Sequence, residues 1–130
     1  MMKKAKFYIF SSALSVLIWG LMSCGGPKQV EGTYQVTGSP GVVANIVYAA
    51  NGLGGNSQAN NQTLPWQTTF TGYESEGNYQ GTYVFLSAVN DAAPNSSTSV
   101  TITILENNST FQQPNYAIGG GNPITLFGYF

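Results

Sequence analysis

The feature that most constrains the fold lies at residues 98–105, where apolar and hydroxyl side chains alternate strictly from Ser99 to Ile104. Val100, Ile102 and Ile104 share one face of an extended chain, and the threonines between them share the other. This period of two is typical of a β-strand with one buried face, because an amphipathic helix repeats its apolar residues about every 3.6 positions. Segments of this kind bury their apolar faces by packing one sheet against another.

Other segments with strand character recur along the chain, separated by clusters of glycine, asparagine and proline. Residues 82–89 are apolar on both faces, which predicts a central strand. Asn107 and Asn108 predict a hairpin turn, since asparagine tolerates the positive φ of such turns. The polar stretch 51–62 is expected to be a loop. The remaining strands are expected at residues 33–37, 42–48, 64–71, 110–112 and 123–130. Seven short strands without a helical period predict an all-β fold, an antiparallel β-sandwich of immunoglobulin-like character.

The first 24 residues have the layout of an export signal rather than of a strand. Three lysines within the first six residues precede an apolar segment at 7–21, and small Ser23 then precedes the only cysteine, Cys24. The apolar segment falls short of the roughly 20 residues that a bilayer span needs, and serines interrupt it. We therefore expect an N-terminal signal helix ahead of the β-sandwich.

The stretch Leu21-Met22-Ser23-Cys24 resembles the lipobox at which bacterial lipoproteins are processed. The resemblance implies cleavage between Ser23 and Cys24 and attachment of lipid to the Cys24 thiol, whose thiolate is the nucleophile. Two or three acyl chains would anchor the protein permanently. With Gly25 after the cysteine, the processing site resembles that of lipoproteins sent to the outer membrane of Gram-negative bacteria. The expected location is therefore the cell envelope. An ordinary signal peptide with an incidental cysteine and an uncleaved anchor helix are the alternatives.

This interpretation divides the chain into a signal peptide at 1–23, a flexible tether at 24–32 and a β-sandwich domain at 33–130. The tether contains glycine and polar residues without an apolar period. The domain has the size of one small folding unit. Once Cys24 is lipidated no thiol remains for a disulfide, so the core is expected to depend on packing alone.

Composition narrows the functions open to the mature chain. Without residues 1–23, one lysine stands against five carboxylates, and there is no arginine or histidine. Such a surface does not neutralise phosphates, so we expect no binding of nucleic acid. The usual pairs of base and nucleophile are missing, so we expect no enzyme and no cofactor. No metal site is predicted; Glu74 and Glu76, with Asn78 or the pair 90–91, supply the weaker calcium alternative.

Five short motifs follow one another along the predicted domain. They are Tyr34-Gln35-Val36-Thr37-Gly38, Ala44-Asn45-Ile46-Val47-Tyr48, Leu64-Pro65-Trp66, Leu86-Ser87-Ala88 and Val100-Thr101-Ile102-Thr103-Ile104. Their order and spacing resemble the MmpS family of transport accessory proteins, small membrane-anchored β-sandwiches that work beside RND-type lipid and siderophore exporters. The resemblance covers about residues 33–106 and implies a sandwich with a transporter partner. The chain departs from the family in two respects. It has a lipobox where the family has a transmembrane anchor, and it lacks the family's cysteine pair within the domain.

Three aromatic residues are candidates for core or ligand contacts. Pro65 marks the start of a strand that turns Trp66 inward, onto the face that carries Phe70; a sugar-stacking platform is the alternative. Tyr73 and Tyr79 lie in a glycine-rich loop, where they are candidate contacts for a glycan, a lipid or a protein. The alternative is that they pack on the sandwich edge. The predicted function is a non-catalytic, membrane-anchored envelope lipoprotein that binds a protein partner or assists transport, with glycan binding, lipid binding or a structural role as the alternative.

Overall fold

The computed structural model describes residues 25–50 and 55–130, and this part of the chain contains β-strands and no helix. The signal segment and the predicted processing residues Ser23 and Cys24 lie outside the described residues. Nothing in the described ranges forms a helix that is long and apolar enough to span a membrane. The strands are β1 (Gln29–Gly38), β2 (Val43–Ala50), β3 (Gly55–Thr63), β4 (Trp66–Tyr73), β5 (Tyr83–Asn90), β6 (Ser99–Glu106), β7 (Ser109–Thr110), β8 (Asn115–Ile118) and β9 (Pro123–Tyr129).

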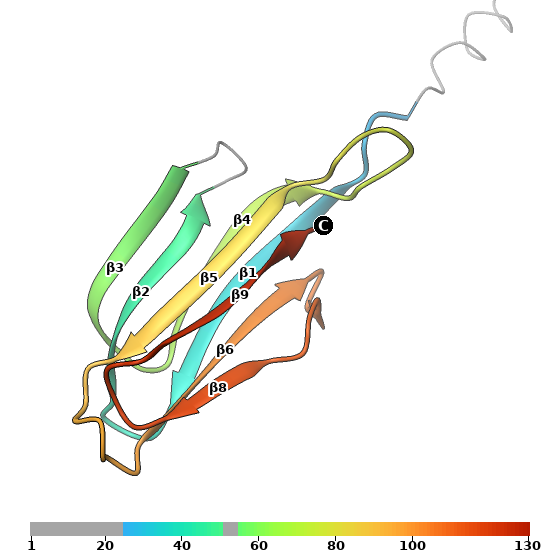
Figure 1. The fold of residues 1–130 in the computed structure, drawn as a ribbon. Coiled ribbons are helices and arrows are strands. Elements are labelled where there is room, and N and C mark those ends of the chain that lie inside the picture. The colour runs from blue at the N-terminus through green and yellow to red at the C-terminus, as the bar shows by residue number, and fades with distance from the viewer. Residues whose placement is uncertain (1–24, 51–54) are drawn as a thin grey trace, which may run out of the picture.

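The strands form two antiparallel sheets packed face to face (Figure 1). Sheet A has the order β4-β1-β6, and β7 and β8 both pair with the far side of β6; sheet B has the order β3-β2-β5-β9. The predicted antiparallel β-sandwich is confirmed. The strand connectivity differs from that of an immunoglobulin constant domain. In that domain the first two strands are neighbours in one sheet, whereas β1 and β2 here belong to different sheets.

The core lies between the sheets and follows the predicted alternation. Val100, Ile102 and Ile104 of β6 are fully buried, and the threonines between them lie on the outer face. In sheet B, β5 lies between β2 and β9, as expected of a central strand, and buries Val84 and Leu86. Hydrophobic burial from both sheets therefore supplies the stability of a domain that has no disulfide among the described residues.

A continuous series of aromatic contacts crosses this core. Neighbouring ring centroids are 4.6 to 5.7 Å apart, and the rings in order are Trp66, Tyr48, Tyr34, Phe70, Phe130 and Phe111. Trp66 packs on the core from a partly buried position, in line with the core interpretation of its sequence motif. Aromatic pairs at such distances add about 0.5–1.5 kcal/mol each beyond the area that they bury.

The first strand begins earlier than the sequence predicts. β1 starts at Gln29 rather than at residue 33, so residues 29–32 of the expected tether belong to the sandwich. Val30 pairs with Gly72 of β4 and is buried, and Gly32 pairs with Phe70. Gly32 hides the start of the strand in the sequence, because it interrupts the apolar alternation with a residue that has no side chain.

Two further strands were not expected. The stretch predicted as a loop at 51–62 contains β3, which pairs with β2 along an outer edge of sheet B. Its asparagine, glutamine and serine side chains have low strand propensity, so only the pairing with β2 makes it a strand. β8 carries the exposed Tyr116 and Ile118 beside β6. Long-range pairing therefore decides both elements.

One side of the sandwich is joined by side-chain hydrogen bonds. Gln112 donates through Nε2 to the carbonyl oxygen of Phe127 at 2.8 Å, and Asn115 donates through Nδ2 to that of Thr125 at 3.3 Å. Both carbonyls belong to β9, the edge strand of sheet B. The β8–β9 side of the sandwich is thus closed, whereas β3 and β4 are the outer strands on the opposite side (Figure 1).

Candidate functional site

Charged residues hold the start of the domain at one end of the sandwich. The Nζ of Lys28 lies 2.6 Å from Oε1 of Glu74, and the Glu74 N–H donates to the Lys28 carbonyl at 2.9 Å. At the same end, the Glu31 N–H donates to Oδ1 of Asn107 at 3.0 Å and the Glu31 carbonyl accepts from the Asn107 N–H at 2.8 Å. The chain is therefore fixed to the β4–β5 loop and the β6–β7 turn from Lys28 onward.

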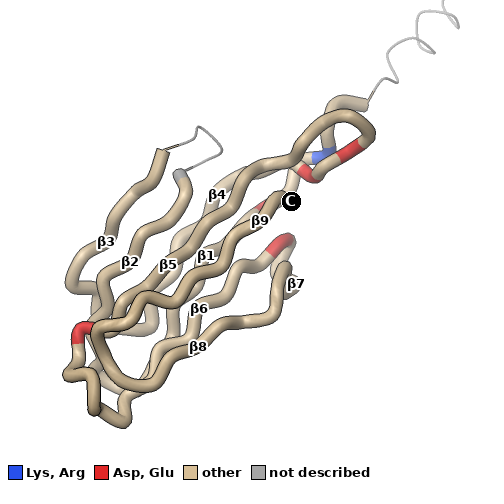
Figure 2. Tube along the Cα trace, viewed as in Figure 1, with Lys and Arg blue, Asp and Glu red and all other residues tan. Residues whose placement is uncertain are grey.

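At this end Lys28 and Glu74 stabilise each other, whereas the carboxylates of Glu74 and Glu106 repel each other. The hydrogen bond from Lys28 to Glu74, together with the charge of Glu74, raises the pKa of Lys28. Burial raises the pKa of Glu106, and the nearby Glu74 carboxylate adds to the effect. Figure 2 shows acidic residues near both ends of the sandwich.

The loop that carries Tyr73 and Tyr79 is well anchored but leaves both rings accessible. Tyr73 at the end of β4 is 39% exposed and Tyr79 in the β4–β5 loop is 45% exposed. Tyr79 forms reciprocal backbone hydrogen bonds with Glu76, and Ser75 donates from its N–H and its hydroxyl to the Phe130 carbonyl at 2.7 and 2.5 Å. Within the described chain neither tyrosine joins an aromatic pair. Tyr73 and Tyr79 remain candidate ligand contacts, at the same end of the sandwich as the ion pair of Lys28 with Glu74.

The structure separates Glu74 from Asn90 and Asp91, which formed one version of the calcium alternative. Glu74 is engaged with Lys28 beside the loop that precedes β5, whereas Asp91 follows the other end of that strand. The Asn90 side chain is buried and donates to Oγ1 of Thr98 and to the Gly119 carbonyl, both at 3.1 Å. Across residues 25–50 and 55–130, no three His, Cys, Asp or Glu side chains gather at one point. Asn90 therefore has a structural task, holding two loops together.

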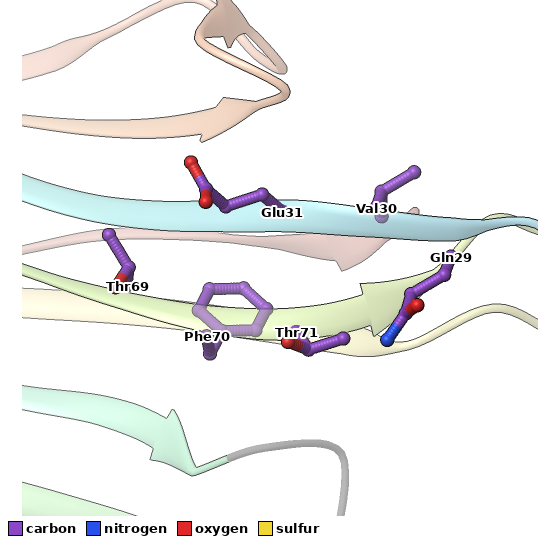
Figure 3. Close-up of a pocket in the computed structure, with 6 residues that line it drawn as sticks. All are labelled: Gln29, Val30, Glu31, Thr69, Phe70 and Thr71. Atoms are coloured by element: carbon purple, nitrogen blue, oxygen red, sulfur yellow. The ribbon is translucent and has the colours of Figure 1, made fainter.

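A hollow of about 450 Å³ lies beside the start of β1 and the end of β4. Figure 3 shows its lining residues coming from these two neighbouring strands. They are Gln29, Val30, Glu31, Thr69, Phe70 and Thr71. Glu31 is the single ionisable group among them, without a nucleophile or a second carboxylate beside it. The hollow offers no general acid–base pair.

A smaller cleft, of about 170 Å³, opens between the two sheets on the β3–β4 side. Its walls include Tyr48 and Ser57 from sheet B and Tyr34, Thr68 and Phe70 from sheet A. The Tyr34 hydroxyl accepts a 3.4 Å hydrogen bond from the Phe85 N–H, and burial raises the pKa of Tyr34 to about 12. The cleft is thus uncharged at neutral pH and combines aromatic walls with hydroxyl groups.

The outer face of sheet B carries a group of aromatic side chains, here called the aromatic face: the exposed Tyr83, Phe127 and Tyr129 and the half-buried Phe85. Tyr83 lies opposite Tyr129 with ring centroids 5.3 Å apart, and Phe85 lies opposite Phe127. Phe127 is 63% exposed, Tyr129 47% and Tyr83 37%. No charged residue occurs in β2, β3, β5 or β9. An exposed apolar group of this kind is typical of a binding surface.

No family model matches this chain, and no curated protein is similar to it. The resemblances to the lipobox and to the MmpS family therefore depend on the sequence motifs alone. The aromatic face was missed because the sequence signal for it, aromatic residues at every second position in 83–85 and 127–129, also suits a buried strand. Pairing of β5 with β9 brings those residues together on the outer face.

Proposed function

We propose that this chain is a membrane-anchored, non-catalytic lipoprotein of the cell envelope whose domain binds a protein partner through the aromatic face, with a transport-accessory role as the specific form. The aromatic face is the observation that carries the proposal. The buried parts of protein interfaces are enriched in tyrosine and phenylalanine and depleted in charge. Phe127, the most exposed member of the face, lies in a sheet whose four strands contain no charged residue.

The anchor in this proposal is lipid on Cys24, formed after cleavage that follows Ser23. The chain between Cys24 and the ion-paired Lys28 reaches about 13 Å at most, at about 3.3 Å per residue. The charged end of the sandwich would then stay close to the bilayer, with the strands leading away from it. The aromatic face would stand beside the membrane, where another protein of the outer membrane can reach it.

Two features support binding rather than catalysis. The hollow beside β1 and β4 offers Glu31 as its one ionisable group, and the walls of the cleft between the sheets carry no carboxylate, amine or thiol. A general acid and a general base acting together need two groups that change their protonation state near neutral pH within reach of the substrate, and neither the hollow nor the cleft offers two. The raised pKa of Tyr34 removes its hydroxyl from that range.

The test is photo-cross-linking in intact cells. A photo-reactive amino acid in place of Phe127 should trap a discrete protein adduct, whereas the same residue in place of the exposed Ser97, in the β5–β6 loop, should trap none. Lipid labelling of the processed chain establishes that both variants reach the membrane. Absence of any protein adduct from Phe127 would contradict the proposal.

Glycan binding is the second candidate, and one observation favours it. Beside the aromatic face, Thr125 donates from Oγ1 to Oγ of Ser87 at 3.2 Å, so hydroxyl groups and aromatic rings share the outer face of sheet B. The negative face of an aromatic ring attracts the polarised C–H bonds of a sugar. The purified lipoprotein should then bind at least one member of a panel of neutral polysaccharides, and the Phe127→Ala variant should bind it more weakly. Unchanged polysaccharide affinity in the Tyr73→Ala and Tyr79→Ala variants would exclude the loop between β4 and β5 as the glycan site.

A further inference from the structure

We propose that the outer edge of β3 is a strand-addition site, at which an extended, uncharged segment of the partner protein joins sheet B and places one apolar side chain in the cleft between the sheets. This inference rests on the proposed binding of a protein partner and states how that partner docks. Strand addition obtains affinity from main-chain hydrogen bonds and specificity from pockets for alternate side chains. The β3–β4 side of the sandwich offers both.

The two edges of sheet B differ in their protection. The outer edge of β9 has two of its carbonyl groups capped by the side chains of Gln112 and Asn115. β3 is nine residues long and contains no charged residue and no proline. Its one irregularity is a register shift near Asn61, which leaves residues 55–59 regularly paired with β2. Natural edge strands are usually blocked by charge, proline, shortness or cover. Residues 55–59 carry no charge and no proline, and no other described strand pairs with their outer edge.

The cleft lies where an added strand would point its inner side chains. Ser57 pairs with Tyr48 and Ala59 with the buried Ile46, so both face the space between the sheets. A strand added beside β3 continues that alternation and directs every second side chain toward Thr68 and its neighbours on β4. The cleft volume is about 170 Å³, and a cavity of about 150 Å³ is known to hold benzene. One aliphatic or aromatic side chain therefore fits.

Charge and size select the occupant. The strands that border this side, β2, β3 and β4, carry no charged residue, so they offer no partner to a charged segment. Bringing an unpaired charge to such a surface is unfavourable. A second copy of this chain would present its own Ser57 or Ala59 over the cleft, and these side chains are too small to fill it. An uncharged segment of another protein with a larger apolar residue is the better complement.

The experiment uses a phage-displayed library of ten-residue peptides and the full-length lipidated protein in detergent micelles. Gln58→Lys combined with Asn60→Lys places charge on the β3 edge at two exposed positions. The control, Asn95→Lys combined with Ser97→Lys, adds the same charge to an exposed loop. Selected peptides should be uncharged with alternating apolar residues, and should bind the β3 variant at least tenfold more weakly while binding the control as they bind wild type. Ser57→Leu, which fills the cleft and leaves the edge neutral, should weaken them as well.

Three outcomes would overturn the inference. They are a library that yields no such peptides, peptides that bind the β3 lysine variant as tightly as wild type, and a wild-type dimer that the β3 lysines dissociate, which would assign the edge to a second copy. The proposed function is tested separately by cross-linking from Phe127. If the protein adduct persists in the β3 lysine variant with unchanged yield, strand addition fails and partner binding stands. If no adduct forms in wild type, partner binding itself fails.

Discussion

The ring of Phe70 lies across Gly32 of the neighbouring strand, in the space that a side chain at position 32 would occupy. A Cβ at Gly32 would overlap the ring itself. The same ring stacks on Tyr34 with centroids 4.6 Å apart and on Phe130 at 5.7 Å. The absence of a side chain at Gly32 therefore permits the central contacts of the aromatic series that crosses the core.

Gly32→Ala is expected to lower the free energy of unfolding by about 1–3 kcal/mol, because overpacking forces Phe70 away from its neighbours. Chemical denaturation followed by the near-ultraviolet signal of the aromatic residues measures both the stability and the environment of the rings. Gly55→Ala is the matched control, since a Cβ at Gly55 meets open space in another strand. Its free energy of unfolding should stay close to that of wild type. Equal losses in the two variants would mean that Phe70 moves without cost.

Tyr34 should make the protein sensitive to high pH. Its pKa of about 12 in the folded protein stands above the ordinary value of 10.0, so folding favours the protonated hydroxyl. The resulting stabilisation is complete below pH 10 and is lost as the pH rises to about 12. Two pKa units correspond to about 2–3 kcal/mol at most.

Denaturant unfolding of wild type and Tyr34→Phe across this alkaline range isolates the effect. The variant loses the acceptor for the Phe85 N–H and should be less stable at neutral pH by about 1 kcal/mol. Its stability should then fall less steeply than that of wild type at alkaline pH. Parallel curves for the two proteins would show that the Tyr34 hydroxyl titrates normally.

Local patterns in the sequence predicted the parts of the fold that local chemistry decides. The alternation around Ile102 marked a half-buried strand, and Asn107 and Asn108 adopt the predicted positive φ, 47° and 63°. By contrast, β3 owes its structure to pairing with β2, a contact that its Asn and Gln side chains do not announce. The aromatic face depends in the same way on the register that sets Phe85 opposite Phe127. Sequence patterns indicate which residues share a face of one strand, while neighbours across strands come from long-range pairing.

Phe127 is expected to matter for binding and little for stability. With the photo-reactive residue at Tyr83, Phe127→Ala should reduce the cross-linking yield at least tenfold, because it removes the most exposed ring of the aromatic face. Its free energy of unfolding should change by no more than about 0.5 kcal/mol, as for other exposed positions.

Leu126→Ala on the opposite face of β9 is the control for that variant. Leu126 packs against the core, so its truncation should cost about 2 kcal/mol of stability. The folded protein should still cross-link with unchanged yield. A loss of cross-linking in Leu126→Ala but not in Phe127→Ala would show that the partner does not bind at the aromatic face.

Cys24→Ser tests the anchor on which the proposed location depends. The serine hydroxyl does not provide the thiolate that takes up the diacylglyceryl group, so labelling by a radioactive lipid precursor should disappear. Without the acyl chains the permanent lipid anchor is lost, so fractionation should find the variant released or mislocalised. The domain begins four residues later, at the ion pair of Lys28 with Glu74, and should unfold with the same denaturation midpoint as wild type. A Cys24→Ser protein that remains labelled and membrane-bound would contradict the entire assignment of residues 21–24 as a lipobox.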